Sequence, residues 1–399
     1  MKIATALSST LALMVFGIGG AQALTPNEQL GKLIFFDVNL SINSNQSCAT
    51  CHGPDVGWTG PDESINLGGS VYEGSIAGRF GNRKPPSSAY ATYSPIFHFS
   101  EKQGLFIGGN FWDGRATGER LGNPAADQAQ GPFLNPVEQA LSTPADIVKQ
   151  ICTGAYSAQF TAVWGASACY AANVDMAYDN VALSVAAYED SSEVNAFSSK
   201  YDAFRAGTTK LTKEEKKGRN LFKGKAKCSR CHPISGKAPL LTDFTFDNLG
   251  IPKNPENPFY VQDPNWIDLG LGGFLATRAE YADMAAENYG KHKVPTLRNV
   301  DKRPSPDFVK AYGHNGYFKS LEGIVHFYNT RDVKPNCESF GINDATEQTA
   351  LSNNCWPEPE VTENINTTEL GDLGLTEDEE HAIMVFMKTL TDGYVAPTP

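Results

Sequence analysis

The sequence predicts a mostly α-helical fold with long loops, in which two related domains follow one another along the chain. The first observation is a Cys-x-x-Cys-His motif that occurs twice, at residues 48–52 and 228–232. The second is helical periodicity: apolar residues recur at three- and four-residue spacing over residues 145–152, 180–188 and 375–390. Since no long segment alternates apolar and polar residues as a strand does, we expect the regular segments to be helices.

The repeated motif is typical of the attachment site of a c-type haem. In such a site the two cysteines form thioethers to the porphyrin, and the histidine is the first protein ligand of the iron. A zinc knuckle would need a second Cys/His pair close by, which neither motif has. We therefore expect two covalently bound haems. The residues assigned to them are Cys48, Cys51 and His52 for the first, and Cys228, Cys231 and His232 for the second.

Residues 1–23 have the pattern of a secretory signal peptide. Lys2 gives a short positive start, an apolar run follows from Leu11 to Ile18, and Ala21-Gln22-Ala23 is a small-x-small cleavage site. We expect a mature protein that begins near Leu24 and is exported to the periplasm. No later stretch is long and apolar enough to predict a membrane span.

Two segments that lead into the haem motifs align without a gap. Residues 24–28 and 211–215 both read Leu-Thr-x-x-Glu, and a glycine and apolar residues follow at the same offsets. Threonine at a helix cap with glutamate three residues later is a helix-start signal. This internal repeat predicts two cytochrome c-like haem domains, at residues 24–205 and 206–399. Residues 248–273 are dense in Pro, Gly and Asn, and we expect a long loop there.

The net charge and the remaining cysteines indicate which partners and which compartment suit the protein. The formal charge of −12 argues against nucleic acid as a partner, because phosphates need a basic surface. It permits a basic protein partner. Four cysteines lie outside the haem motifs and form two local pairs, which favours disulfides 152–169 and 337–355 in an oxidising compartment. Four cysteines allow three pairings, and the alternative is that they stay reduced.

The sixth coordination position of each iron decides its chemistry. A haem iron transfers electrons when a second side chain fills that position, and reacts with peroxide when the position is open. Residues 53–97 contain no His and no Met, so we expect the first haem to be five-coordinate. His98 could reach back, but a lone histidine is more often a surface or core residue.

Four further segments and one single residue identify the family that the sequence resembles. They are Phe111 to Ala116, Gln128 to Pro132, Glu138, Lys293 to Val300, and Tyr312 to Gly316. Together with both haem motifs in order, they resemble the bacterial diheme cytochrome c peroxidases and their MauG-like relatives over nearly the whole mature chain. One departure is a group of extra residues between Trp112 and Gln128, which leaves the loop geometry open.

The resemblance implies roles for residues around the first haem. Glu138 corresponds to the residue that moves a proton on bound peroxide, which is general acid–base work. Gln128 would hydrogen-bond the bound oxygen, and Pro132 would wall the pocket. Trp112 corresponds to the tryptophan between the two haems, where an indole can pass an electron. The alternatives are a solvent-facing glutamate and a buried core tryptophan.

The resemblance also implies a calcium ion between the haems. The backbone carbonyls of Lys293 and Pro295 match its ligand positions, and Asn82 is the candidate for the side-chain ligand. The family asparagine could also align one or two residues later, where this chain has Arg83 and Lys84. Backbone oxygens and water suit a hard cation.

The residue that fills the sixth position of the second haem separates the branches of the family. The register of the family helix places Tyr328 there, where the MauG-like enzymes have tyrosine and the classical peroxidases have methionine. His326 is the competitor. Side chains two positions apart on a helix point in directions that differ by about 200°, so only one of Tyr328 and His326 can face the iron. The family register favours Tyr328.

An open first haem and a tyrosine-bound second haem resemble the MauG-like branch, and within it the methanobactin-associated MbnH type. This implies a periplasmic enzyme that uses hydrogen peroxide, through a high-valent iron state, to oxidise tryptophan in a partner protein, which in that branch is copper-related. The alternatives are a peroxidase that draws electrons from a small redox protein, and a non-enzymatic diheme electron carrier.

The exit route for electrons stays open at this point. In MauG a surface tryptophan lies two residues before the second haem motif, and here that position is Ala226. Trp58, Trp266 and Trp356 are the unplaced candidates.

Overall fold

The computed structural model of the chain describes residues 23–396. The predicted signal peptide, residues 1–23, lies outside the described residues except for its last position. The helices and strands follow in chain order: α1 (Pro26–Phe36), α2 (Cys48–Cys51), α3 (Glu63–Leu67), β1 (His98–Ser100), β2 (Leu105–Ile107), α4 (Pro124–Leu134), α5 (Pro144–Thr153), α6 (Ser157–Trp164), α7 (Val174–Asp190), α8 (Lys200–Arg205), α9 (Lys213–Lys223), β3 (Phe246–Asp247), α10 (Phe259–Gln262), α11 (Gly270–Leu275), β4 (His292–Lys293), α12 (Leu321–Thr330), α13 (Glu347–Ser352) and α14 (Glu377–Lys388).

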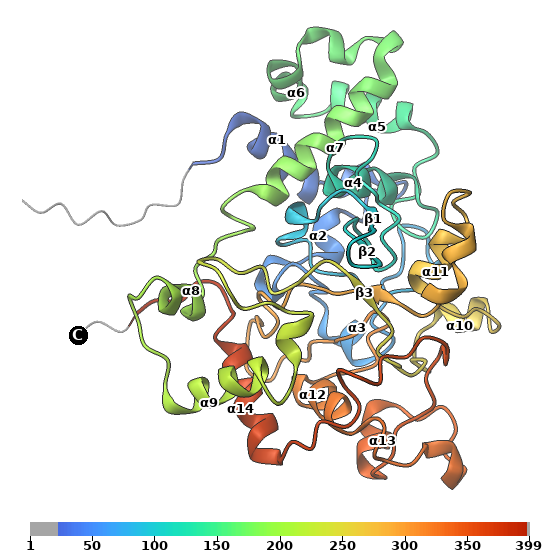
Figure 1. Cartoon of the computed structure of the whole chain (residues 1–399). Coiled ribbons are helices and arrows are strands. Elements are labelled where there is room, and N and C mark those ends of the chain that lie inside the picture. Colours follow the sequence, from blue (N-terminus) through green and yellow to red (C-terminus); the bar gives the residue numbers. More distant parts are fainter. Residues whose placement is uncertain (1–22, 397–399) are drawn as a thin grey trace, which may run out of the picture.

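The prediction of a mostly helical fold is confirmed. The strands form only two short antiparallel pairs, β1 with β2 and β3 with β4. Long loops join most elements (Figure 1). No helix among residues 23–396 combines the length and apolar character needed to cross a bilayer.

The two predicted helix starts are capping boxes. In α1, Thr25 Oγ1 accepts from the backbone N–H of Glu28, and Glu28 accepts from the N–H of Thr25 at 2.6 Å. In α9, Thr212 and Glu215 make the same reciprocal pair. Each box satisfies backbone donors that a helix start leaves free.

The helices that follow these caps cross a second helix closely at a glycine. α1 packs on α7, and α9 packs on α14. A Cβ at Gly31 would lie 1.8 Å from the carbonyl oxygen of Ser184, and one at Gly218 would lie 1.7 Å from that of Ala382. Only glycine leaves room for the two backbones to approach this far.

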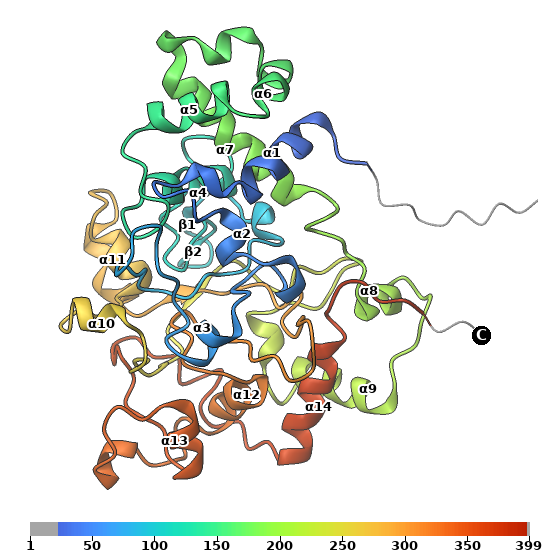
Figure 2. The same cartoon turned by 180° about the vertical axis from the view of Figure 1, so that it is seen from behind.

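The apolar side chains gather in two large cores. One core contains buried residues from Leu30 to Val194 and lies among α1, α4, α5 and α7. The other contains residues from Tyr201 to Leu390 and lies among α9, α12 and α14. Figures 1 and 2 show these two groups of helices at opposite ends of the molecule. A smaller cluster brings Phe97 and Phe106 against Phe246.

The two predicted disulfides are confirmed, as Cys152–Cys169 and Cys337–Cys355. The prediction of a loop over residues 248–273 was wrong for α10 and α11, which are short helices. In α11 Leu271 and Leu275 are buried in the small aromatic cluster, and Gly272 lies against Tyr289. Tertiary packing thus outweighs the low helix propensity of glycine.

The two glycine crossings give a stability prediction. We expect Gly31→Ala and Gly218→Ala each to lower the free energy of unfolding by about 1–3 kcal/mol, because the added methyl group collides with a backbone carbonyl. Denaturant unfolding of the purified protein measures this. Gly131→Ala in α4 is the matched control, since a Cβ added at Gly131 would have its nearest neighbour 3.5 Å away. Equal stability of all three variants would contradict the close crossing.

Candidate functional site

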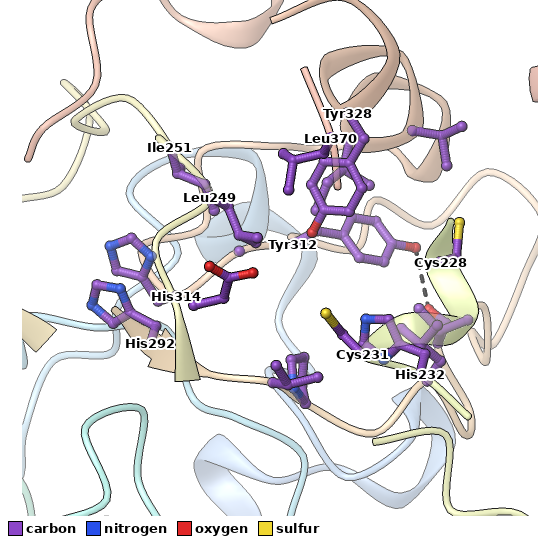
Figure 3. A pocket seen from close by; sticks show the side chains of 18 of the residues that line it. Cys228, Cys231, His232, Leu249, Ile251, His292, Tyr312, His314, Tyr328 and Leu370 are labelled. Atoms are coloured by element: carbon purple, nitrogen blue, oxygen red, sulfur yellow. Dashed lines mark hydrogen bonds between the residues drawn. The ribbon is translucent and has the colours of Figure 1, made fainter. Parts of the chain in front are cut away.

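The structure contains two large cavities, and each is lined by one Cys-x-x-Cys-His motif. The N-terminal cavity, lined by Cys48, Cys51 and His52, has an empty volume of about 1650 Å³. The C-terminal cavity has an empty volume of about 1740 Å³. It is lined by Cys228, Cys231 and His232, which Figure 3 shows together on one side of it.

The two motif histidines are held in the same way. The backbone N–H of each donates to the carbonyl of the first motif cysteine. Nδ1 of His52 lies 3.1 Å from the carbonyl oxygen of Trp58, and Nδ1 of His232 lies 2.8 Å from that of Leu241. A proton on Nδ1 completes each hydrogen bond and leaves Nε2 free to bind a metal.

The electrostatics of the two histidines also suit a ligand. Burial lowers the pKa of His52 to about 4 and lowers the pKa of His232, so both rings are neutral at pH 7. The four motif cysteines are free of disulfides. Each cavity therefore offers two thiols, a neutral imidazole and a large space, and this donor set fits a covalently attached haem.

Helix α12 turns Tyr328 and His326 in different directions. Ser320 caps the helix, and its hydroxyl accepts from the N–H of Gly323 at 2.9 Å. Tyr328 lines the C-terminal cavity, and its ring points into the cavity in Figure 3. Nδ1 of His326 lies 3.1 Å from both carboxylate oxygens of Glu380 on α14. His326 is not among the described residues that line the cavity.

The predicted peroxide-site residues come together at the N-terminal cavity. Gln128 and Pro132 line it from α4, which Asn123 caps, and Glu138 lines it from the turn after α4. Burial raises the pKa of Glu138, although Arg115 and Asn135 act in the opposite direction. The carboxyl group is therefore easier to protonate than an exposed one.

The N-terminal cavity has few candidates for a second iron ligand; Tyr72 and Tyr90 are the tyrosines among the described residues that line it. His52 is the only His or Met among the described lining residues. His98 lies on β1 with an exposed side chain, and its Nδ1 is 2.8 Å from the carbonyl of Ile96. The sequence allowed His98 to bind the first iron, but in this structure its side chain does not line the N-terminal cavity.

Trp112 lies between the two cavities and lines both. Its indole Nε1–H donates to the carbonyl of Lys84 at 2.8 Å, and its own carbonyl accepts from the N–H of Lys293 at 2.7 Å. These main-chain contacts fix the ring in the wall that separates the cavities.

The candidate calcium residues lie in the same wall. Lys293 and Pro295 line both cavities, while Asn82 lines the N-terminal cavity only. The carbonyl groups suit a hard cation. However, the buried amino group of Lys84 also lines both cavities, where it donates to Thr59 Oγ1 at 2.9 Å. Burial lowers the pKa of Lys84 to about 7, so a cation in this wall would meet an amine that is only partly charged at neutral pH.

Several residues at the site carry no sequence signal of their own. Arg83 donates to both carboxylate oxygens of Asp268 and to Asp113, next to Trp112. Glu189 on α7 lines the N-terminal cavity, and burial raises its pKa to about 8. Arg83 and Asp268 lie far apart in the sequence, and Glu189 belongs to no motif, so spacing within a motif does not reveal these residues.

Comparisons with known proteins agree with this arrangement. The model of a family described as di-haem cytochrome c peroxidase matches residues 25–210. The methylamine utilization protein MauG of Paracoccus denitrificans is 32% identical over 399 residues, which cover 97% of this chain and 95% of that protein. The cytochrome c551 peroxidase of Nitrosomonas europaea is 25% identical and covers 76% and 74%. The diheme peroxidase BthA of Burkholderia thailandensis matches with a TM-score of 0.73 at 28% identity, over 93% of this chain and 87% of that one.

The geometry of α12 predicts which variant changes the second iron. We expect Tyr328→Phe to remove a low-spin ferric signal from the electron paramagnetic resonance spectrum, because the phenol oxygen that faces the cavity is lost. His326→Gln should keep that signal, since this side chain faces Glu380. The reverse pattern, with the signal lost only in His326→Gln, would contradict the assignment.

Proposed function

This chain belongs to the family of di-haem cytochrome c peroxidases and MauG, and from this premise we propose that it uses hydrogen peroxide to oxidise tryptophan in a partner protein. As a member it is a haem peroxidase-type oxidoreductase. When bound, the two haems supply the redox chemistry that reduces peroxide and stores its oxidising equivalents. The observation that carries the proposal is a difference among the described lining residues: the C-terminal cavity has Tyr328 at the family position on α12, while the N-terminal cavity has no histidine besides His52 and no methionine.

The proposed roles of the residues follow from where they lie. Cys48, Cys51, Cys228 and Cys231 would attach the haems, and His52, His232 and Tyr328 would bind the irons. Glu138 would accept a proton from peroxide and return it to the departing oxygen, for which its raised pKa is suited. Gln128 would donate a hydrogen bond to the bound oxygen, and Pro132 would exclude water beside it.

Trp112 would couple the two cavities. Its N–H donates to a backbone carbonyl, which cannot accept a proton at neutral pH. An indole that loses an electron there keeps its proton and its positive charge, so the oxidising equivalent can be shared without any proton movement.

The organisation around the site extends the proposal. We propose two haem domains over residues 24–205 and 206–399, related by an internal repeat; the paired capping boxes and glycine crossings support this. The sequence before Leu24 supports export to the periplasm. A calcium ion held by the carbonyls of Lys293 and Pro295, with Asn82, is also proposed, and the partly charged amine of Lys84 is the feature that opposes it.

Peroxide reduction with electrons from a small redox protein is the second candidate. The relatives named cytochrome c peroxidase favour it. The choice of tryptophan oxidation rests on Tyr328 and on the similarity to MauG. The partner, including a copper-related one, is proposed from the MauG-like resemblance alone. A non-enzymatic electron carrier is not retained, because the family consists of enzymes.

The ferric protein should show one high-spin and one low-spin haem, and should react with peroxide without prior reduction. Incubation with peroxide and the protein encoded by a neighbouring gene should then increase the mass of a tryptophan-containing peptide of that protein. Rapid, sustained peroxide consumption with reduced cytochrome c, and no change in the partner, would favour the second candidate. Two low-spin haems and no reaction with peroxide would exclude both.

The role of Glu138 predicts a pH dependence. The base form of a carboxyl group exists above its pKa, and the pKa of Glu138 is raised from 4.5. The rate of reaction with peroxide should therefore fall as the pH drops through a value above 4.5. Glu138→Gln should slow this rate by about 10²-fold or more and remove the pH dependence. Stopped-flow absorbance measures both, and an unchanged rate would contradict the assigned role.

A further inference from the structure

Oxidation of a partner protein requires a path between the cavities and the surface. The position of the MauG surface tryptophan is Ala226, which is 3% exposed and belongs to a core. Of the other candidates, Trp58 and Trp356 are buried, and Trp266 is half-buried. Trp266 follows α10, which lies at the edge of the molecule in both Figure 1 and Figure 2.

Trp266 lies next to an aromatic residue that is buried. Its ring centroid lies 5.6 Å from that of Tyr260, which is a buried residue of α10. On the outer side, Val261 is 84% exposed and Ile267 is 53% exposed. Apolar contact with another protein is therefore available next to the indole.

Tyr260 is bonded to the wall of the C-terminal cavity. Its hydroxyl donates to Oε1 of Glu360 at 2.6 Å. Glu360 lines that cavity, and its Oε2 lies 4.0 Å from Nε2 of His314. The His314 ring lies 6.5 Å from that of Trp112, centroid to centroid. Figure 3 shows His314 beside His292, across the cavity from Cys228.

This wall contains buried polar atoms without hydrogen-bond partners, although His292 Nε2 lies 3.3 Å from a carboxylate oxygen of Asp268. Oε2 of Glu360, Nε2 of His314 and Nε2 of His292 are buried and have no hydrogen-bond partner among the described residues. The two imidazole rings stack at 3.6 Å. Unpaired buried polar atoms cost stability, so their presence calls for a functional explanation.

The surroundings of Tyr260 couple its oxidation to loss of a proton. The ammonium of Lys253 lies 3.7 Å from the ring centroid, so a positively charged tyrosine radical would be repelled. Burial opposes ionisation of Glu360, but the nearby His314 imidazole and the hydrogen bond from Tyr260 outweigh it and hold the Glu360 pKa below its usual value. The carboxylate is thus ready to accept the phenol proton.

We infer that Trp266, Tyr260, Glu360 and His314 form a proton-coupled electron relay from the protein surface to the C-terminal cavity and Trp112. This inference rests on the proposed function and supplies its exit route. The groups between Tyr260 and Trp112 follow one another at 2.6 Å, 4.0 Å and 6.5 Å. Glu360 and His314 are not oxidised themselves; they fill the space across which the electron tunnels from Tyr260.

The transfer of one electron through the relay, called a passage below, balances in electrons and protons. Tyr260 gives one electron toward the C-terminal cavity, its O–H bond breaks, and the proton bonds to Oε1 of Glu360. An electron from Trp266 reduces the tyrosine radical, and the proton returns from Glu360. A side chain of the partner then reduces Trp266. Two passages supply the two electrons that, with two protons, reduce one hydrogen peroxide to two waters.

Without a partner, Trp266 is itself the end of the relay. Two passages oxidise its indole by two electrons, and water supplies the oxygen that the indole gains. We therefore treat the haem-loaded protein with peroxide alone and map oxidised tryptophan by peptide mass spectrometry. We expect oxidation at Trp266. We expect its loss, to the level without peroxide, in Tyr260→Phe and in Glu360→Gln, because Gln can accept the hydrogen bond but is not a base.

Trp164 provides the matched control. It is also half-buried, and its Nε1 donates to Ser184 on α7, away from both cavities. Its oxidation should stay at the background level in every protein, and Trp164→Phe should leave Trp266 oxidation unchanged. Wild-type oxidation of Trp266 in both Tyr260→Phe and Glu360→Gln would overturn the relay while the proposed function stands. No absorbance change on adding peroxide to the wild type would instead overturn the proposed function.

Discussion

The hydrogen bond from the Trp112 indole to the carbonyl of Lys84 is the contact on which the arrangement of the two cavities depends. It fixes the ring in a wall that both cavities share, and the carbonyl of Trp112 ties the same wall to β4. The acceptor is a backbone amide rather than a base. Tyr260 is the opposite case, since its hydroxyl donates to a carboxylate. In the proposed function, one aromatic residue would keep its proton on oxidation and the other would give it up, so Trp112 would hold an oxidising equivalent and Tyr260 would pass one on.

Around Trp112 the loops are held by buried ion pairs rather than by a sheet. Arg83 bridges Asp113 and Asp268, which are distant from it in the chain, and Arg115 adds a second cation to Asp113. Buried ion pairs add little net stability, but removal of one partner leaves a costly unpaired charge. Their role here is geometric: they allow only one relative placement of the loops that carry Trp112 and the stacked histidines.

Local sequence patterns predicted the parts of the structure that local interactions determine. The capping boxes at Thr25 and Thr212, the C-terminal helix and both disulfides follow from residues close together in the chain. The family register favoured Tyr328 over His326 as the ligand of the second iron, which stays a prediction; Tyr328 lines the cavity, and His326 is not among its described lining residues. The contact between Tyr260 and Glu360 joins residues 100 positions apart, and no periodicity records it. The helix α11 was missed because burial of its leucines, not propensity, stabilises it.

The two disulfides have a consequence for how the protein responds to heat. They close loops of 17 and 18 residues, each beside one of the two large cores. Each would stabilise its own region by about 3 kcal/mol, by limiting the freedom of the unfolded chain. No disulfide among the described residues links one core to the other. Each covalent cross-link therefore limits the unfolded chain within one end of the molecule, while contacts such as that of Tyr90 with Asp392 join the two ends without a covalent bond.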